Sequence, residues 1–387
     1  MITIEKPLVL PDTYPLSRIG ALVDILFFDI ETTGLSGDSS MLYLIGCVFY
    51  REESWNLIQW FADTPSSEKE ILCSFFDFLK QFKFLLHFNG DSFDIPYLLK
   101  RCHFFGLNFD FSQIESIDMY KRIKPFKKLL GLENLKQKTI EALLGIRRQD
   151  LFTGGQLIEV YHDYLATGDS DLYHLLILHN EDDLKGMPSI LPILNYLDFL
   201  NFPFIPDSWE VKTFYDAFDH EEKALCLRYK SEVFLPSPIE AECEPFSLEA
   251  EDNRLTLRIS LAEGEMKHFY PNYKDYYYLI YEDTAIHKSV GEYVERTARK
   301  KATAKTCYTR TKGIFLPQPS PVFGNFLKKE YSDKLTYVPY NEELGKCLAE
   351  QTDFFDKNSE EKKEETLRHY LQSVLSLFFP FFYGKNP

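Results

Sequence analysis

Two acidic residues at the end of an apolar segment are the first feature of this sequence that suggests chemistry. Asp29 and Glu31 stand two positions apart in FFDIETTGL, where the apolar run 24–30 ends. Residues two apart in a strand point to the same side, so both carboxylates face one surface. Two like charges beside a buried sheet are costly unless a cation lies between them, and a divalent metal ion meets that need. A solvated D-x-E pair is the alternative, and the TTGL that follows favours the metal site.

Two later segments place further acids near the ends of predicted elements. HFNGDSFD follows a predicted strand and puts Asp94 at the start of the next helix, with Asp91 as a competing acid. HNEDDL lies on a predicted helix, where His179 and Asp183 are four positions apart and therefore share one face. Taken alone, each segment favours a structural explanation: an acid that stabilises a helix N-terminus, or a solvated helix end.

The three segments together favour a different interpretation. Four carboxylates bring about four negative charges, which two divalent ions would neutralise; they belong to Asp29, Glu31, Asp94 and Asp183. Oxygen ligands without cysteine favour Mg²⁺ or Mn²⁺ over zinc. Two such ions form a clamp for phosphodiester hydrolysis, in which one activates water and the other stabilises the leaving oxygen. A histidine beside the last ligand is suited to accept the proton of that water.

D-x-E-T-T-G-L, N-G-x-x-F-D and H-N-x-x-D, in this order, resemble the three exonuclease motifs of the DEDD group of the ribonuclease H-like superfamily. The motif style is most similar to the YprB-like branch, and the resemblance covers roughly residues 22–200. It implies a 3′–5′ exonuclease that uses two metal ions and acts on a single strand or a 3′ end, of DNA or RNA.

The resemblance also implies a role for each matched acid. Asp29 would bridge both ions, while Glu31 and Asp183 would bind the catalytic one. Asp94 would hold the second ion through water, and Asn89 would lie behind these ligands.

Contacts with the substrate are implied for the residues after the first motif. Thr32, Thr33 and Leu35 would hold the 3′-terminal nucleotide and wedge its base. The H-x-x-x-D spacing of the third motif is one residue shorter than in the His-type enzymes of the group, and equals the spacing of the Tyr-type ones. His179 is therefore expected either as the general base or as a residue that positions the substrate or the helix.

The elements that must position these residues alternate between strands and helices in the first half of the chain. Apolar runs predict strands at 24–30, 41–50, 55–61 and 83–88. Apolar residues at helical spacing predict helices after Ser67, at 93–101, and over 133–144, 156–166 and 170–185. With the first three strands as a meander, this is an α/β domain: a ribonuclease H-like mixed sheet flanked by helices.

A change in composition marks a second domain. The stretch NFPFIPDS (201–208) is the expected boundary between an exonuclease domain over 1–204 and an α+β C-terminal domain over 205–387. Residues 285–315 carry eight lysines and arginines against two glutamates, and ARKKATAKTCYTR mixes these cations with an aromatic ring. Cations bind phosphates and rings stack bases, so nucleic-acid contacts are predicted for Arg299, Lys300, Lys301 and Lys305. A solvated basic helix is the alternative.

Overall composition excludes several classes of protein. With 387 residues, 45% of them hydrophobic, the chain is neither disordered nor collagen-like nor a disulfide miniprotein. The net charge of −16 argues against non-specific adhesion to nucleic acid or anionic membranes, and it is compatible with a local basic surface. Seven scattered cysteines without C-x-x-C predict reduced thiols in the cytoplasm. Because neither a secretory signal nor a membrane span is evident, we expect no membrane association.

Two other functions are open from the sequence. One is a catalytically silent protein that binds nucleic acid or acts as a scaffold on the same fold, which the presence of all four acids argues against. The other is a metal-dependent endonuclease, which the TTGL segment disfavours because it is suited to gripping a 3′ end.

Overall fold

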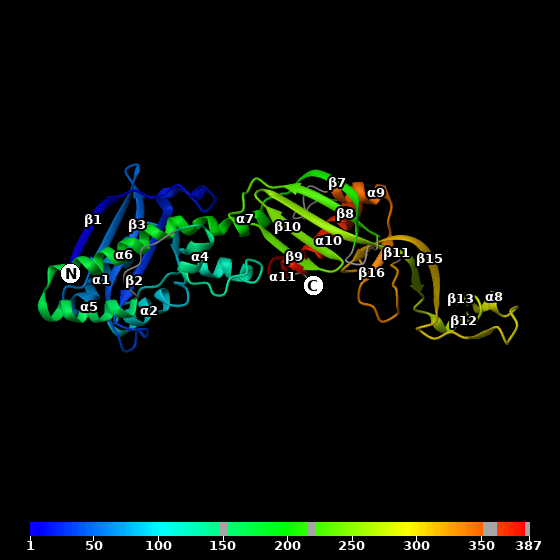
Figure 1. Ribbon diagram of the computed structural model, residues 1–387. Helices are drawn as coiled ribbons and strands as arrows, with labels where there is room; N and C mark the ends of the chain where they lie inside the picture. The colour runs from blue at the N-terminus through cyan, green and yellow to red at the C-terminus, as the bar shows by residue number, and fades with distance from the viewer. Residues whose placement is uncertain (147–153, 216–220, 325, 351–361, 384–387) are drawn as a thin grey trace. The chain divides into compact units, whose positions relative to one another are not determined.

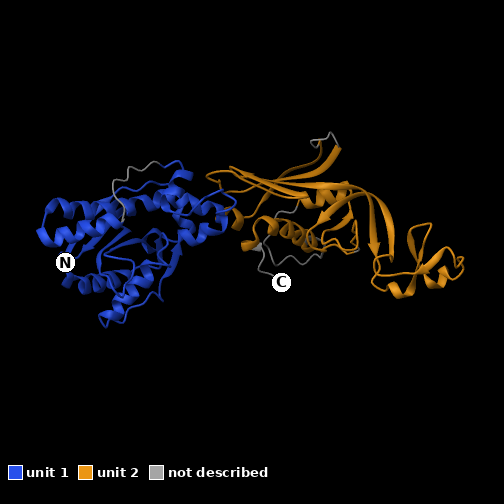
Figure 2. Ribbon diagram, turned by 60° about the horizontal axis from the view of Figure 1, so that its bottom comes forward, with its two compact units in different colours: residues 1–197 blue, residues 198–387 orange. Residues whose placement is uncertain are grey.

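The chain divides into two compact units, residues 1–197 and 198–387 (Figure 2). The computed structural model describes residues 1–146, 154–215, 221–324, 326–350 and 362–383. All seven cysteines are free thiols, and within these ranges no helix has the length and apolar character to cross a membrane.

A six-stranded mixed sheet forms the centre of the first unit, in the order β1-β4-β3-β2-β5-β6 (Figure 1). Its strands are β1 Ile2–Leu8, β2 Ile25–Thr32, β3 Leu42–Arg51, β4 Ser54–Phe61, β5 Phe84–His87 and β6 Glu115–Asp118. The predicted meander is confirmed in β2, β3 and β4, which pair antiparallel, while β5 and β6 continue beside β2 in parallel. The edge strands β1 and β6 are additional to the four predicted strands.

Helices α1 Glu68–Leu79 and α6 Ser170–Ile190 pack on the strands of this sheet. The other helices of this part of the chain are α2 Asp94–Phe104, α3 Met119–Ile123, α4 Gln137–Leu143 and α5 Gly154–Thr167, and α7 Asn195–Asn201 crosses the boundary between the two units. Neighbouring residues of β2 show the two layers, because side chains alternate between faces along a strand. Phe28 stacks on Phe75 of α1 with 5.7 Å between ring centroids, whereas Asp29 faces Asn180 of α6. The expected mixed sheet flanked by helices is confirmed.

The second unit contains a seven-stranded antiparallel sheet and a smaller three-stranded one. The large sheet holds β7 Ile205–Tyr215, β8 Glu221–Lys230, β9 Ile239–Cys243, β10 Phe246–Glu251, β11 Arg254–Phe269, β15 Tyr308–Gln318 and β16 Thr336–Pro339. The small sheet holds β12 Tyr276–Leu279, β13 Thr284–His287 and β14 Arg299–Lys301. Four helices complete the unit: α8 Lys288–Gly291, α9 Glu342–Ala349, α10 Lys362–Phe378 and α11 Pro380–Tyr383. The expected α+β character is confirmed.

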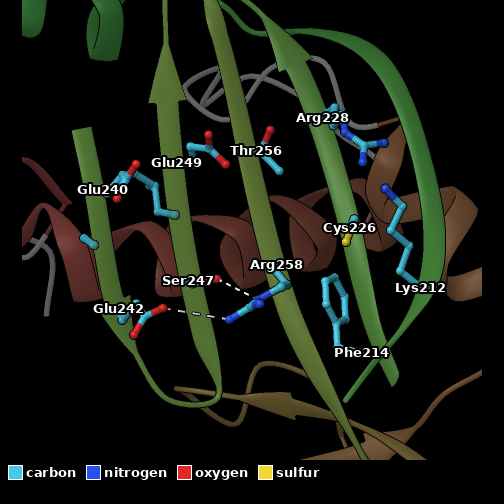
Figure 3. A pocket seen from close by; sticks show the side chains of 12 residues that line it. Lys212, Phe214, Cys226, Arg228, Glu240, Glu242, Ser247, Glu249, Thr256 and Arg258 are labelled. Atoms are coloured by element: carbon cyan, nitrogen blue, oxygen red, sulfur yellow. Dashed lines mark hydrogen bonds and ion pairs between the residues drawn. The ribbon is translucent and has the colours of Figure 1, made fainter. Parts of the chain in front are cut away.

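The large sheet of the second unit has one covered and one open face. Helix α10 packs on the covered face, where Tyr370 donates a hydrogen bond to the carbonyl of Pro317 at 2.8 Å. Buried positions alternate with more exposed ones along β10 and β11, as expected for a sheet with one solvated face. Charged and polar side chains on the open face line a hollow of about 610 Å³, and Figure 3 shows them on the side opposite the helix.

Candidate active site

A β-bulge at the end of β2 shapes the centre of the candidate site. The pairing of β2 with β3 is regular up to Glu31 and shifts in register before Thr32, which leaves Tyr43 as an extra residue on β3. Bulges bend a strand, redirect side chains and are frequent next to active sites. Tyr43 is buried, stacks on Tyr161 of α5 at 4.2 Å between centroids, and hydrogen-bonds to Glu31. The bulge therefore fixes the Glu31 carboxylate.

The structure brings the four predicted acids into one electrostatic cluster. Burial, together with the charges of the other acids, raises the pKa of Asp29 well above its usual range and that of Glu31 to about 8. The largest of these charge effects on Glu31 come from Asp183 and Asp94. Asp94 is itself buried at the start of α2, and burial raises its pKa to about 7.

His179 joins this cluster from α6. Its Nε2 atom lies 3.3 Å from Oδ2 of Asp183 and 3.8 Å from Oε1 of Glu31. One ligand atom from each of these three residues lies within 4.8 Å of the other two. The adjacent Asp182 is exposed, so α6 turns Asp183 and not Asp182 toward the cluster.

This donor set fits divalent metal ions. The neighbouring charges that act most strongly on Asp29 and Glu31 are other carboxylates, so their repulsion is not offset by a nearby cation of comparable effect. A divalent ion would replace the lost hydration and cancel the repulsion, and it would lower the pKa values again. Carboxylate oxygens are the ligands that Mg²⁺ and Mn²⁺ prefer.

A buried amide relay holds Asp29, and sequence reasoning missed it. Asn180 donates from Nδ2 to Oδ2 of Asp29 at 3.0 Å. Gln59 of β4 donates to Oδ1 of Asn180 at 2.9 Å and to the carbonyl of Ile177 at 3.0 Å. Because Gln59 binds the oxygen of the Asn180 side chain, the amide nitrogen is turned toward Asp29. The available signal was Gln59 itself, a lone amide inside the apolar run NLIQWF.

Gly46 makes room for this relay. It pairs with Asp29 across β2 and β3, and α6 passes directly over it. A Cβ atom at position 46 would lie 2.0 Å from Oδ1 of Asn180 and 2.5 Å from Cδ1 of Leu184. Both distances are far below van der Waals contact, so a side chain here would force the Asn180 and Leu184 side chains of α6 out of their positions.

Gly46→Ala is therefore expected to lower both stability and activity. Forcing extra volume into a packed interface costs about 1–3 kcal/mol of unfolding free energy, and displacing the Asn180 side chain removes its hydrogen bond to Asp29. We expect at least about a tenfold loss in Mg²⁺-dependent hydrolysis, since misplacing a catalytic group by 1 Å costs on the order of 100-fold. Gly155→Ala is the matched control, because Gly155 lies on α5 with open space at its Cβ position. Urea unfolding of both variants checks the prediction, and equal stability of Gly46→Ala and wild type would contradict it.

The loop after β2 carries the residues predicted to hold the 3′ end. Thr32 donates from Oγ1 to the carbonyl of Gly34 at 2.9 Å, and Thr33 accepts from the N–H of Met41 at 3.0 Å. Leu35 is 89% exposed. The loop is thus ordered by its own hydrogen bonds, and it presents a leucine to solvent.

A buried ion pair anchors the base of this loop. Arg101 of α2 donates from Nε and Nη2 to both carboxylate oxygens of Glu68, at 2.6 and 2.7 Å. Its Nη1 donates to the carbonyl of Gly37 at 3.0 Å, and Glu68 also accepts the N–H of Leu42 at 2.9 Å. This clamp joins α1, α2 and the loop, and the sequence pattern did not indicate it.

The structure separates the two candidate acids of the second motif. Asp91 binds the ammonium group of Lys121 at 2.7 Å and the hydroxyl of Ser116, and these bonds lower its pKa against the effect of burial. Asp94 is therefore the acid that joins the cluster. Asn89 lies in the turn between β5 and α2 with φ of 65°, a conformation that asparagine tolerates, and its N–H donates to Asp118 at 2.9 Å.

The predicted basic residues of the second unit lie in and beside the small sheet. Arg299, Lys300 and Lys301 form β14, so a basic helix, the alternative interpretation of this segment, is wrong. The guanidinium of Arg299 lies 4.4 Å from the centre of the Tyr277 ring, and the ammonium of Lys300 lies 5.1 Å from that of Tyr278. Strand pairing places these cations over tyrosines of β12. Lys305 is exposed in the loop that follows.

A family model matches a large part of the first unit. Residues 26–195 match the family model of the RNase_H superfamily. A DNA polymerase of Thermococcus kodakarensis (strain ATCC BAA-918 / JCM 12380 / KOD1) is 35% identical over 94 residues, which is 22% of this chain and 6% of the polymerase. The similarity therefore concerns a small part of that enzyme.

Two solved structures are similar to larger parts of the chain. The family B DNA polymerase of the archaeon Pyrobaculum calidifontis is 13% identical, with a TM-score of 0.36 over 65% of this chain and 35% of the polymerase. The zinc-bound complex of E. coli exonuclease I with single-stranded DNA is 12% identical, with a TM-score of 0.26 over 54% of each chain.

Proposed function

Residues 26–195 form an RNase_H superfamily domain, and we propose that this domain is a metal-dependent 3′–5′ exonuclease acting on single-stranded nucleic acid. The observation that carries the proposal is the cluster of Asp29, Glu31, Asp94 and Asp183, whose burial and mutual repulsion call for divalent cations. A catalytically silent protein would gain nothing from buried carboxylates that repel one another and destabilise the fold.

The chain's own residues define the proposed mechanism. Asp29 would hold both ions while Asn180 keeps its carboxylate in place. Glu31 and Asp183 would hold the catalytic ion, and Asp94 the second one through water. Mg²⁺ or Mn²⁺ bound there would supply an activated water and neutralise charge on the leaving oxygen.

His179 is the proposed proton acceptor of the attacking water. Its Nε2 atom lies 3.8 Å from Glu31 and 3.3 Å from Asp183, and this closeness to two of the proposed metal ligands supports a role as proton acceptor. The two carboxylates would also stabilise the imidazolium after proton transfer.

Substrate contacts extend the proposal to the loop and to the second unit. Leu35, exposed on an ordered loop beside the acids, would wedge the terminal base, with Thr32 and Thr33 holding the nucleotide. The nucleic-acid strand would also contact four residues of the second unit, namely Arg299, Lys300, Lys301 and Lys305.

A comparison of linear and circular substrates tests the activity. With Mg²⁺, we expect a 5′-labelled single strand to shorten progressively from its 3′ end, while a circular single strand stays intact. Cleavage of the circle would establish an endonuclease instead. Binding of both substrates without cleavage in Mg²⁺ or Mn²⁺ would establish a silent binding protein.

The adjacent acids of α6 give a matched pair of variants. Asp183→Asn is expected to lower kcat/KM at least about 100-fold, as for removal of a group that stabilises the transition state. Asp182→Asn is expected to stay within about twofold, because successive helical residues point roughly 100° apart and Asp182 is exposed. Hydrolysis of one short substrate by both variants checks this. A larger loss of kcat/KM in Asp182→Asn than in Asp183→Asn would make Asp182 the metal ligand instead.

A further inference from the structure

Among the hollows of the second unit, two differ clearly in what they offer a ligand. The hollow on the open face of the large sheet (Figure 3) has cations that already have acidic partners. Arg228 donates to Glu210, and Arg258 donates to Ser247 at 3.0 Å and lies 3.9 Å from Glu242. These pairs leave the two arginines less available to bind an anionic ligand.

The other hollow is aromatic. Its volume is about 520 Å³, within the usual range of ligand pockets. We call it the aromatic cleft, and its lining includes Phe269, Tyr270, Tyr273, Phe326, Lys328 and Tyr331. It lies where β11 ends and where the chain returns toward β16.

The rings of the aromatic cleft are held from one side and open on the other. Phe269 and Tyr331 pack edge to face with centroids 5.3 Å apart, and Tyr270 stacks on Tyr276 at 4.9 Å. Even so, Tyr331 remains 44% exposed and Phe326 41% exposed. Aromatic rings that are exposed to water and held in fixed positions are suited to stack against another flat group.

One lysine lines the aromatic cleft, and two exposed lysines adjoin its lining residues in the sequence. Lys328 belongs to the lining of the cleft, and its backbone N–H and carbonyl form hydrogen bonds with the backbone of Lys267 in β11. Lys274 and Lys305 are exposed, and each directly follows a lining residue in the sequence. Lys267 is paired with Glu330 at 2.7 Å, and Lys328 donates to the carbonyl of Asp333 at 2.7 Å. Lys274 and Lys305 have no ion-pair partner among the described residues, so they are the cations left for a ligand.

We propose that the aromatic cleft binds an unstacked base of a single strand, while Lys274 and Lys305 contact the neighbouring phosphates. Proteins that hold single strands combine ring faces for bases with cations for the backbone, and both are present here. An apolar peptide would use the rings and leave Lys274 and Lys305 without acidic partners. The inference rests on the proposed nuclease function, to which it adds a second point of contact with the strand.

Binding of two equally charged strands tests this proposal. The probes are a labelled 12-nucleotide oligo-dT and the same sugar-phosphate strand without bases, measured by fluorescence anisotropy with the full chain in EDTA. We expect Phe326→Ala and Tyr331→Ala each to weaken oligo-dT binding about 5- to 100-fold, the range for loss of one stacked base. Both should leave binding of the abasic strand within twofold.

Matched variants separate base contacts from charge and from folding. Lys305→Ala should weaken both strands by a similar factor, because phosphates are common to both. Tyr281→Ala and Tyr293→Ala remove exposed rings of the same unit that do not line the aromatic cleft. These two variants should leave the affinity for oligo-dT and for the abasic strand unchanged. Thermal unfolding of each variant confirms that the side chains tested do not support the fold.

The outcomes distinguish this proposal from the nuclease function. If Phe326→Ala and Tyr331→Ala both keep wild-type affinity for oligo-dT, the aromatic cleft binds no base, although the chain can still degrade strands in Mg²⁺. A loss of equal size for the abasic strand would also overturn the proposal. Cleavage of a dinucleotide, too short to need a second contact, should be equal in wild type, Phe326→Ala and Tyr331→Ala.

Discussion

Asp29→Asn is expected to abolish hydrolysis and to leave the melting temperature equal or higher. Asp29 would bind both ions, and its pKa is raised by burial and then by Glu31, Asp183 and Asp94. Without metal, the folded protein must keep this carboxyl protonated or tolerate the repulsion from the other acids. A neutral amide of the same shape therefore removes an unfavourable contribution to the free energy of folding. We expect a loss of at least about 1,000-fold in kcat with Mg²⁺, the scale on which electrostatic catalysis by such groups operates.

Activity and melting temperature in EDTA must be measured on the same preparation of this variant. Asp182→Asn is its control, since that acid is exposed and its substitution changes net charge by the same amount. More than a tenth of wild-type activity would contradict a bridging role for Asp29. A large drop in melting temperature would show that the cluster stabilises the fold without metal.

In EDTA, the protein is expected to lose stability as pH rises from about 5 to about 8. The pKa of Glu31 is raised to about 8 and that of Asp94 to about 7, so between their unfolded and folded pKa values the folded state binds more protons. Unfolding free energy falls with pH wherever the folded state binds more protons, and each unit of pKa difference corresponds to about 1.4 kcal/mol. At about 2–4 °C per kcal/mol, the melting temperature should fall by several degrees.

Millimolar Mg²⁺ should reverse most of this loss. Metal binds the ionised carboxylates and only the folded site, so the rise in melting temperature should be larger at pH 8 than at pH 5. A double variant, Asp29→Asn with Glu31→Gln, should show a flatter pH profile and little response to Mg²⁺. A wild-type melting temperature in EDTA that is constant over this pH range would contradict the strained cluster.

Local periodicity was enough to predict the elements that carry the acids. The apolar runs of β2 to β5 are continuous, so their positions followed from the sequence, and alternation gave Asp29 and Glu31 a common side. Helical spacing likewise paired His179 with Asp183. Each of these inferences depends on residues within a few positions of one another.

Features that depend on distant contacts were not predictable in this way. The local pattern left Asp91 as a competitor of Asp94, and only the resemblance selected Asp94. The physical reason is Lys121, which binds Asp91 and lies 30 residues away from it. The hydrogen bond from Gln59 to Asn180 joins residues 121 apart. The second unit was predicted only as α+β, because one strand, β11, pairs with three others and its sequence does not indicate which ones.

The position of β1 at the edge of the first sheet bears on how the protein behaves at high concentration. An edge strand presents unpaired backbone groups, which another chain can use to extend the sheet into aggregates. β1 contains Lys6 and Pro7 in succession, and proline offers no N–H to an incoming strand. The opposite edge, β6, is only four residues long. Both edges therefore carry features that oppose self-association, although the strands between them are almost entirely apolar.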